Sequence, residues 1–360
     1  MAPVMTSQDL QAWVRSRLSL VDAALTAHVE GMPAQLPQSG AEYRRLWQRL
    51  GEQFAGGKNL RPALTLAAYS GLGGDNADAV VPVAASMEML HTAMLVHDDI
   101  LDHDEVRRGR PNVAGTRRAE LAARRLPPAQ LDDHVMTAAL LSGDLALSST
   151  YDMIARASLP AHHRLAALDL VTRAIRATIA GELLDMCGDL SSMEDADALT
   201  VAELKTATYS FVVPLLAGAT IAGADPTMIA HLERIGTALG LSFQLVDDDL
   251  GVFGDPDVTG KTNLSDLRAG KRTELMRIAH VQADPLQRAI LDRHVGDPAL
   301  TDAGAAHVRQ VLIDTGARDA TLKLARRHAR QAKRIASERV PAPLSGYLTS
   351  VVDMLDGRPS

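Results

Sequence analysis

The chain has 360 residues, 46% of them hydrophobic and 22% charged, with a formal net charge of −7 and a pI near 5.9. This composition can form a sizeable core and excludes a disordered chain. The acidic balance argues against a general nucleic-acid-binding protein, so any polyanionic ligand must be held by local basic groups.

Alanine and leucine dominate the apolar residues, aromatic residues make up only 3%, and helical spacing recurs along the whole chain. Ala and Leu lose little conformational freedom in a helix, so this pattern predicts an all-α protein. No shift in composition marks a domain boundary. We therefore expect a single large antiparallel helical bundle, one domain over residues 1–360 with short flexible ends at 1–7 and 356–360.

The first helical period runs through Val14, Leu18, Val21 and Leu25. Further helices are predicted, to within about 2–4 residues, at 42–56, 60–72, 78–104, 131–158, 161–187, 198–209, 211–223, 227–253, 273–282, 302–337 and 342–355. Short breaks are predicted at 73–75, 108–111 and 126–128. The longest break, 254–270, is rich in Gly, Asp and Lys, and a connection of that length is typical of a lid or a binding loop.

Features that bear on compartment are few. Cys187 is the only cysteine, so no intramolecular disulfide can form and a reducing compartment is compatible. The N-terminus lacks the charged start and apolar stretch of a signal peptide. The longest apolar segments, 79–96 and 211–224, are interrupted by Pro82 and Pro214, and neither is an uninterrupted run of about 20 apolar residues. We therefore expect buried core helices, no membrane span and a cytoplasmic location.

Two acidic clusters end apolar helical segments. In the first, Asp98 and Asp102 are four residues apart and therefore lie on one helix face. Like charges at that spacing destabilise a helix by roughly 0.2–0.5 kcal/mol unless a cation lies between them. The second cluster is the run of three aspartates at 247–249. Carboxylates without His or Cys partners suit hard cations, and the pair of clusters indicates a Mg²⁺ site more than solvated helix ends.

Basic residues accompany these clusters in three places. The segment 57–62 (GKNLRP) lies at a predicted helix start, and 107–109 (RRG) follows the first acidic cluster. The third set, after the second cluster, consists of Lys261, Arg268, Lys271 and Arg272. Arg and Lys are natural partners of phosphate oxygens, although each set alone is weak evidence. Their alternation with the acidic clusters predicts two anionic groups, one held by metal and one by cationic side chains.

These motifs together resemble the trans-isoprenyl diphosphate synthases, the family that includes farnesyl and geranylgeranyl diphosphate synthases. The resemblance covers about 56–273, with the motifs in the family's order. Segment 57–62 resembles the isopentenyl diphosphate motif, 98–102 with 107–109 resembles the first aspartate-rich motif, and 243–248 resembles the second, extended by 260–261 and 266–271. Smaller matches lie at 143–144, 181–182 and 205–206.

The chain departs from the family pattern at three positions. Gly251 stands where the second motif usually ends in Asp, which leaves Asp247 and Asp248 to carry that motif. Asn112 stands where a small hydroxyl residue is common, and Glu182 stands where Gln often follows the Gly. We expect these changes to alter fine substrate geometry more than the reaction itself.

The resemblance implies a fold and a site. The fold would be an isoprenoid synthase-like bundle around a central apolar cavity. About three Mg²⁺ ions would be bound with substrate present, and their ligands would be Asp98, Asp102, Asp247 and Asp248. The residues implied in catalysis are Asp98, Asp99, Asp102, Arg107, Lys205, Asp247 and Asp248. The residues implied for the allylic diphosphate are Arg107, Lys205, Thr206, Gln244, Lys261 and Lys271, and those implied for isopentenyl diphosphate are Lys58, Arg61, His91 and Arg108.

The implied activity is a head-to-tail prenyl transfer by a homodimer. In this family the helix before the first motif lines the pocket for the growing chain, which places Ala93, Met94, Leu90 and Met87 along that pocket. Ala93 leaves the pocket open, and Leu90 lies about 4.5 Å deeper, close to one isoprene unit. The expected product is therefore geranylgeranyl diphosphate, with farnesyl diphosphate as the alternative.

Three other functions are alternatives for the same residues. A class I terpene cyclase also uses aspartate-rich turns, but it has no second substrate and should lack Lys58 and Arg61. A metal-dependent phosphohydrolase would use the His-Asp pair at 97–98 with histidines from other helices, and those at 134 and 162–163 show no such context. A non-enzymatic partner of a synthase would be expected to lose acidic residues, yet both clusters are intact.

Overall fold

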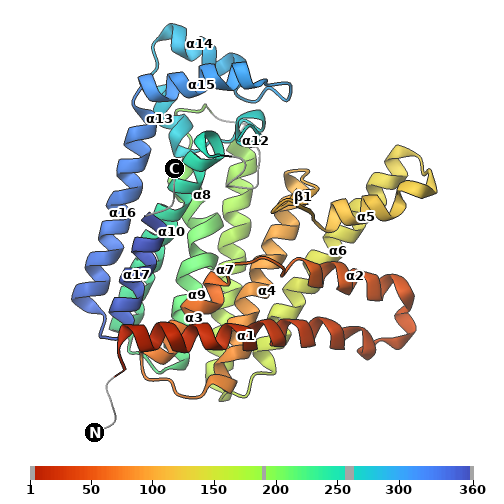
Figure 1. Cartoon of the computed structure of the whole chain (residues 1–360), viewed down its shortest axis with the longest axis vertical. Helices are drawn as coiled ribbons and strands as arrows, with labels where there is room; N and C mark the ends of the chain where they lie inside the picture. Colours follow the sequence, from red (N-terminus) through yellow and green to blue (C-terminus); the bar gives the residue numbers. More distant parts are fainter. Residues whose placement is uncertain (1–4, 189–191, 256–262, 357–360) are drawn as a thin grey trace. The chain divides into compact units, whose positions relative to one another are not determined.

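The computed structural model describes residues 5–188, 192–255 and 263–356. Among these residues almost every element is helical, and the strands form one short hairpin, so the all-α prediction is confirmed (Figure 1). By its contacts the chain divides into two compact units, Met1–Leu170 with Pro214–Ala224, and Val171–Val213 with Asp225–Ser360. Helices α7 (Ala161–Cys187) and α9 (Val213–Ile221) are each divided between the two units, and the single domain stays a prediction.

The first unit is built around α4 (Ala77–Leu101), whose side chains are buried along most of its length. The other elements of this unit are α1 (Ser7–Gly31), η1 (Met32–Gln35), η2 (Pro37–Ser39), α2 (Gly40–Glu52), α3 (Leu60–Gly71), α5 (Val113–Leu121), η3 (Ala122–Arg124), α6 (Pro128–Ala155), the start of α7 (Ala161–Cys187) and most of α9 (Val213–Ile221). Helices α1, α3 and α6 pack against α4. The end of α4 is fixed by a small cluster in which Val96 packs with Val113 and Ala114 of α5 and with Val135 and Ala139 of α6.

A hairpin follows α4 and carries the two arginines of the RRG segment. Strand β1 (Val106–Arg107) pairs antiparallel with β2 (Arg110–Pro111). The turn residues Arg108 and Gly109 have φ of 54° and 70°, the left-handed conformation that two-residue hairpin turns require and that Gly adopts freely. The hairpin therefore places Arg107 in a strand and Arg108 at the turn.

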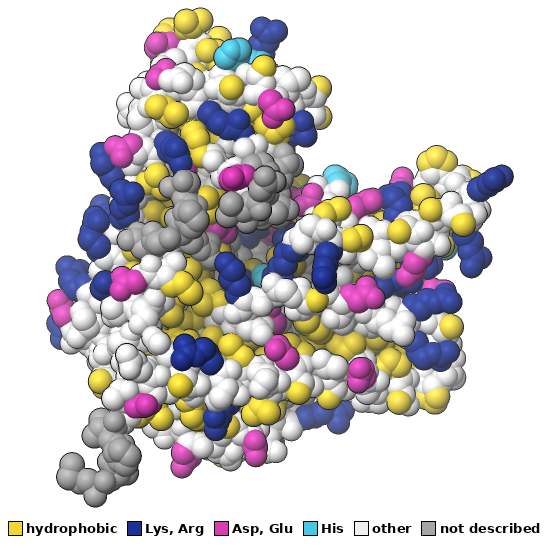
Figure 2. Space-filling model, viewed as in Figure 1, with side chains coloured by type: hydrophobic (Ala, Val, Ile, Leu, Met, Phe, Trp, Pro, Cys, Tyr) yellow, Lys and Arg dark blue, Asp and Glu magenta, His cyan; other side chains and the backbone are white. Residues whose placement is uncertain are grey.

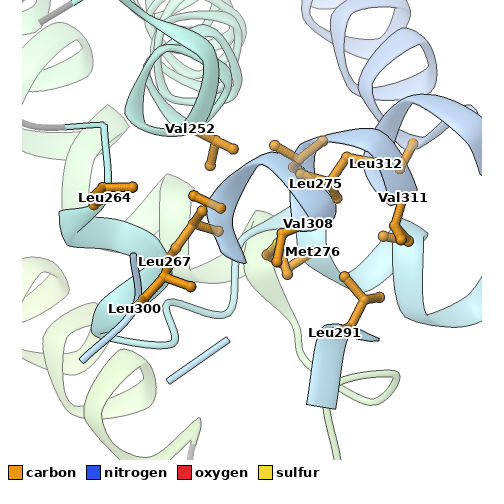
Figure 3. Close-up of a cluster of buried hydrophobic side chains, with 13 residues drawn as sticks. Val252, Leu264, Leu267, Leu275, Met276, Leu291, Leu300, Val308, Val311 and Leu312 are labelled. Atoms are coloured by element: carbon orange, nitrogen blue, oxygen red, sulfur yellow. The ribbon is translucent and has the colours of Figure 1, made fainter. Parts of the chain in front are cut away.

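The second unit is organised around α10 (Pro226–Phe253), which packs against α16 (Ala317–Arg339) and against the π-helical segment η5 (Glu203–Val212). The other elements are the rest of α7, α8 (Ala198–Ala202), α12 (Ser265–Arg268), α13 (Glu274–Gln282), α14 (Pro285–His294), α15 (Asp302–Asp314) and α17 (Leu344–Asp356). Figure 3 shows one of its cores, where Val252 of α10, Leu267 of α12, Leu275 of α13, Leu291 of α14 and Val308 of α15 converge.

Helix α16 is strongly amphipathic. Its buried face is mostly alanine, and its outer face carries exposed basic side chains, seen in dark blue along the left edge of Figure 2. The exposed basic residues of this helix are Lys323, Arg326, Arg327, Arg330, Lys333, Arg334 and Arg339. Such a pattern is typical of a helix that packs on a core by one face and is solvated on the other.

Several predicted boundaries are wrong. The single helix expected over 302–337 is two helices, because Gly316 has φ 70° and ends one before the next begins. The break expected near residue 210 is absent, since Ala198–Ile221 runs on as one helical stretch through η5. Helices α5 and α14 were not predicted, and the break at 254–270 contains the short α12.

In the part of the chain that the structure describes, two helices are long and apolar enough to cross a membrane, judged by length and composition alone. In Ala77–Leu101 and Ala198–Ile221, 83% and 78% of the apolar window is buried inside the protein. Burial of that extent is what core helices of a folded protein show. The expectation of buried core helices is therefore consistent with the structure.

Candidate active site

The first acidic cluster lies at the C-terminal end of α4. Asp102 is the C-cap residue, and its backbone N–H donates to the carbonyl oxygen of Asp98 at 2.8 Å, which places the two residues one helical turn apart. The helix C-terminus adds the negative end of its dipole to the two carboxylates. This end of α4 is therefore suited to a cation, as the spacing in the sequence predicts.

Asp99 is buried, whereas Asp98 and Asp102 are only partly buried. Its Oδ1 accepts a hydrogen bond from Nε of Arg107 at 2.8 Å, and Nη2 of Arg107 also lies 3.2 Å from Oδ2 of Asp98. Burial raises the pKa of Asp99, and the guanidinium of Arg107 opposes that rise. Asp99 therefore orients Arg107, and Asp98 is held between this arginine and the helix end.

The residue Asn112, a departure from the family pattern, has a structural task beside this pair. It is buried, its Oδ1 accepts from the N–H of Gly115 at 2.9 Å, and its Nδ2 donates to the carbonyl oxygen of Asp104 at 2.7 Å. Asn112 thereby caps α5 and ties that helix to the loop that follows α4.

A pocket of about 360 Å³ opens beside α4 in the first unit. Its lining includes Glu88, His91 and Thr92 from successive turns of α4, and Asp99 from the end of that helix. The hairpin contributes Arg107, Arg108 and Arg110. One wall thus carries three guanidinium groups, which is the composition expected of a pocket that binds a phosphate-bearing ligand.

His91 and Glu88 are the buried titratable groups of this pocket. Burial lowers the pKa of His91 well below its usual value, and the nearby charges of Arg61 and Arg108 act in the same direction. His91 is therefore a neutral imidazole that can hydrogen-bond a ligand but adds no charge. Burial raises the pKa of Glu88, while Arg61 and Arg108 lower it. The charges of Arg61 and Arg108 thus act on both groups, and Lys58 is exposed just before α3.

In the second unit, the two short segments that resemble family motifs, 181–182 and 205–206, lie in contact. Nζ of Lys205 lies 3.0 Å from Oε2 of Glu182 and 2.8 Å from Oδ2 of Asp185. A Cβ at position 181 would stand 2.5 Å from the backbone nitrogen of Lys205, so only glycine lets η5 approach α7 this closely. The carboxylate of Glu182, where the family often has Gln, therefore pairs with the predicted diphosphate ligand Lys205.

A hydrogen-bonded chain of predicted site residues fixes one aspartate of the second cluster. Thr206 donates through Oγ1 to Oε1 of Gln244 at 2.8 Å, and Nε2 of Gln244 donates to Oδ1 of Asp248 at 2.8 Å. Gly236 lies two turns and Gly240 one turn before Gln244, and a Cβ at these positions would meet the backbone of η5 at 2.7 Å and 2.4 Å, respectively. One face of α10 thus packs tightly on η5 and ends in the site residues.

The aspartates of the second cluster have different surroundings. Burial raises the pKa of Asp248 to about 8, with further contributions from the charges of Asp266 and Asp247. Asp249 is fully buried and is held by Arg318, whose Nε and Nη2 donate to its two carboxylate oxygens at 2.8 and 3.1 Å. Asp249 therefore ties α10 to α16, while Asp247 and Asp248 are the partly exposed pair.

Asp266 was not predicted as a site residue, although it lies in the same cluster. Its Oδ2 would stand 2.0 Å from a Cβ at position 251, so it occupies the space that the glycine leaves free. Its Oδ1 is 3.7 Å from Nζ of Lys271, a predicted diphosphate ligand. Lys261 lies outside the described residues.

The residues expected to set chain length are part of the buried core of the first unit. Ala93, Leu90 and Met87 are fully buried on α4, and Met94 is partly buried. His97 lies against Gly143 of α6, where a Cβ at position 143 would stand 2.2 Å from Nε2 of His97. Helices α4 and α6 therefore pack closely just before the acidic turn.

The predicted metal ligands fit a divalent metal. They are carboxylates, which suit Mg²⁺. Within the described ranges, no three His, Cys, Asp or Glu side chains are grouped so that they could hold an ion by themselves. Mg²⁺ binds through a few carboxylates together with waters and substrate phosphates, so this open arrangement fits a metal that arrives with a diphosphate.

Of the predicted site residues, one group lies in the first unit and the other in the second. The first group consists of Lys58, Arg61, His91, Asp98, Asp99, Asp102, Arg107 and Arg108, and the second of Lys205, Thr206, Gln244, Asp247, Asp248 and Lys271. That the two groups share one cavity remains a prediction. Glu88 and Asp185 were missed, because a lone carboxylate in sequence gives no sign of the cation that it will meet in the fold. Asp266 begins the matched segment 266–271, but no role was assigned to it.

Comparison with known proteins gives consistent matches. A sequence profile of the family described as Polyprenyl synthetase matches residues 45–312. The geranylfarnesyl diphosphate synthase of Aeropyrum pernix is 34% identical over 296 residues, which cover 80% of this chain and 85% of that protein. The (2E,6E)-farnesyl diphosphate synthase of Mycobacterium bovis is 34% identical over 279 residues, 76% of this chain and 72% of that protein. A solved geranylgeranyl pyrophosphate synthase from Corynebacterium glutamicum, complexed with isoprenyl diphosphate and magnesium, has a TM-score of 0.88 at 28% identity and covers 95% of this chain and 98% of its own.

Proposed function

Since this chain belongs to the polyprenyl synthetase family, and is therefore a trans-prenyltransferase, we propose that it makes geranylgeranyl diphosphate from isopentenyl diphosphate and an allylic diphosphate. The observation that carries the site assignment is the placing of a carboxylate pair and an arginine-lined pocket at the same end of α4. Acidic and basic groups that lie side by side suit two diphosphates, one held through metal and one held directly.

The acidic side of the site binds the allylic substrate. Asp98 and Asp102, with Asp247 and Asp248, are the proposed ligands of about three Mg²⁺ ions. When bound, Mg²⁺ neutralises the charge that grows on the departing diphosphate. Arg107 lies against Asp98 and is oriented by Asp99, so its guanidinium can bind an oxygen of the same diphosphate.

The basic pocket binds isopentenyl diphosphate. Arg108 of the pocket lining, together with Arg61 of α3 and Lys58 just before α3, supplies the cations, and neutral His91 supplies a hydrogen bond. In the reaction the allylic C–O bond breaks with its electron pair on the leaving diphosphate, and the double bond of isopentenyl diphosphate attacks the allylic carbon. A proton is then lost to the released diphosphate. The apolar residues that surround the site exclude water, which would otherwise capture the cation.

The product length rests on the helix that precedes the first acidic turn. Ala93 is the small residue nearest the turn, and Leu90 and Met87 lie deeper on α4. We place the floor of the product pocket at these two residues, which gives a twenty-carbon product. The relatives support a prenyl diphosphate product, and their names differ in chain length.

The proposed assembly is a homodimer in the cytoplasm. Its support is the exposure of large apolar side chains, 46–51% for Met136, Leu140 and Leu141 on α6 and 60–62% for Ile179 and Leu183 on α7. Light scattering at micromolar concentration should give twice the 38.4 kDa chain mass. Ile179→Lys with Leu183→Lys should give a monomer, whereas Leu286→Lys, at a still more exposed leucine, is the control and should not. A wild-type monomer would contradict the dimer.

The assignment of the basic pocket is tested by steady-state kinetics. Lys58→Ala and Arg61→Ala should raise the KM for isopentenyl diphosphate at least tenfold and change the KM for the allylic substrate little. Lys323→Ala, an exposed lysine on α16, is the matched control. An equal effect on both KM values would mean that this basic set binds the other ligand.

A further inference from the structure

Glu88 is a buried carboxylate with an unsatisfied oxygen in the arginine-lined pocket. Its side chain lines the pocket, only 5% of the residue is exposed, and its Oε2 has no hydrogen-bond partner among the described residues. A buried charge without full pairing is costly, so a natural protein that keeps one has a use for it. Glu88 could not be predicted as a site residue from the sequence, because its neighbours in the fold come from other elements.

The surroundings of Glu88 are cationic. The backbone of Gly57 approaches it so closely that a Cβ at position 57 would stand 3.2 Å from Oε1 of Glu88 and 3.5 Å from Nη1 of Arg108. The charges of Arg61 on α3 and Arg108 on the hairpin favour its ionised form. Burial and the charge of Asp22 on α1 favour its protonated form. The two arginines and the burial of Glu88 therefore act on its protonation in opposite directions. A charged ligand that enters the pocket can change the protonation state of Glu88.

The proposed reaction supplies that charge. Only the allylic diphosphate leaves in a head-to-tail condensation, so the diphosphate of isopentenyl diphosphate is retained by the product. A diphosphate held by the arginines of this pocket must therefore enter as substrate and leave as product. An ionised Glu88 beside the same arginines would repel it, and a protonated Glu88 would not.

We propose that Glu88 is the internal counter-ion of this pocket: it positions the guanidiniums of Arg61 and Arg108 when the pocket is empty, and it takes up a proton when a diphosphate binds. When this proton is lost again, the carboxylate of Glu88 competes with the bound product for the two arginines and promotes product release. This inference rests on the proposed binding of isopentenyl diphosphate in the pocket. Glu88 acts through the arginines and is a positioning residue, with His91 one turn further along α4.

The test is calorimetric titration of the full-length protein with isopentenyl diphosphate. The allylic site is first saturated with Mg²⁺ and a thio analogue of the allylic diphosphate, whose carbon–sulfur bond does not break to give the allylic cation. The titration then reports binding to the basic pocket. Each titration is repeated in buffers of different ionisation enthalpy, which gives the number of protons taken up on binding. The variants are Glu88→Gln, which keeps the shape without the charge, and Asp78→Asn, an exposed carboxylate on the same helix as a matched control.

On binding, the wild-type protein and Asp78→Asn should each take up as much as one proton more than Glu88→Gln. Protonation of the ligand itself contributes equally in all three proteins and therefore cancels in this comparison. Binding to wild type should weaken as the pH rises from 6 to 9, while Glu88→Gln should lose less affinity and bind several-fold tighter at the high end. Equal proton uptake in wild type and Glu88→Gln, or a uniform loss of affinity in Glu88→Gln at every pH, would overturn the inference. Absence of any binding to the wild-type protein would instead overturn the assignment of the pocket.

Discussion

The carboxylate of Asp266 fills the space that Gly251 leaves open, because a Cβ at position 251 would stand 2.0 Å from Oδ2 of Asp266. Gly251 is the position at which the chain lacks the last aspartate of its second acidic motif. Asp266 lies close enough to Asp248 to raise the pKa of that carboxyl, so its charge reaches the cluster from a different helix. In place of the aspartate side chain that position 251 lacks, the carboxylate of Asp266 thus occupies the same region of the second acidic cluster.

Gly251→Ala should displace the carboxylate of Asp266 and raise the Mg²⁺ concentration needed for half-maximal activity several-fold. Its effect on the free energy of unfolding should be small, because the displaced atom is the end of a flexible side chain. Calorimetric titration of Mg²⁺ in the presence of the thio analogue gives an independent readout. Gly31→Ala, where an added Cβ meets nothing within 4 Å, is the control. An unchanged Mg²⁺ affinity would mean that Asp266 takes no part in the site.

The three aspartates at the end of α4 should separate into two kinds. Asp98→Ala and Asp102→Ala should lower turnover by orders of magnitude and leave the fold intact. Asp99→Ala should lower the free energy of unfolding by roughly 3 kcal/mol, because it leaves the mostly buried Arg107 without its main partner. Chemical denaturation of each variant measures this difference. Similar losses of stability in all three variants would contradict the separate role of Asp99.

The buried His91 should affect stability at acid pH, and near neutrality it should contribute to substrate binding through a hydrogen bond and not through a charge. Its pKa is lowered well below 6.5, so the unfolded chain binds a proton that the folded protein does not, and stability falls as the pH falls below about 6.5. In His91→Gln this part of the pH dependence should disappear, and the KM for isopentenyl diphosphate should rise only a few-fold. A KM that titrates with the usual histidine pKa in wild type, but not in the variant, would show that His91 acts as a cation.

Ala93→Phe should shorten the main product, because a phenyl ring would close the pocket one isoprene unit nearer the acidic turn. Leu90→Ala with Met87→Ala should lengthen it. Since Ala93 is fully buried, the larger side chain should also cost about 1–3 kcal/mol of stability, and thermal melting shows whether the variant is folded at the assay temperature. A folded Ala93→Phe protein with an unchanged product distribution would contradict this account of chain length.

Features that depend on local spacing were predictable from the sequence. The i, i+4 relation of Asp98 and Asp102 follows from helical geometry, and the structure places them one turn apart at the helix end. The left-handed turn at Gly109 lies within a predicted break. In contrast, Gly316 ends a helix that was predicted to continue, because a glycine within a helical pattern carries no sign of the φ it will adopt.

Features that depend on tertiary contacts were not predictable. Lys205 was expected to bind a diphosphate, but its pairing with Glu182 and Asp185 depends on the close approach of η5 to α7 at Gly181. The burial of Asp249 against Arg318 likewise depends on the packing of α10 on α16. For Lys205 and Asp249 alike, the residue type indicated a charged site residue, but the fold was needed to identify the partner of each side chain.

The most direct test of the central claim is product analysis. The protein is incubated with Mg²⁺, isopentenyl diphosphate and each allylic diphosphate in turn, and the products are separated by chromatography and identified by mass. We predict one isopentenyl diphosphate consumed and one diphosphate released for every five carbons added, a twenty-carbon diphosphate as the main product, and no reaction with EDTA present. A cyclised hydrocarbon formed from the allylic substrate alone, or no consumption of isopentenyl diphosphate, would contradict the account.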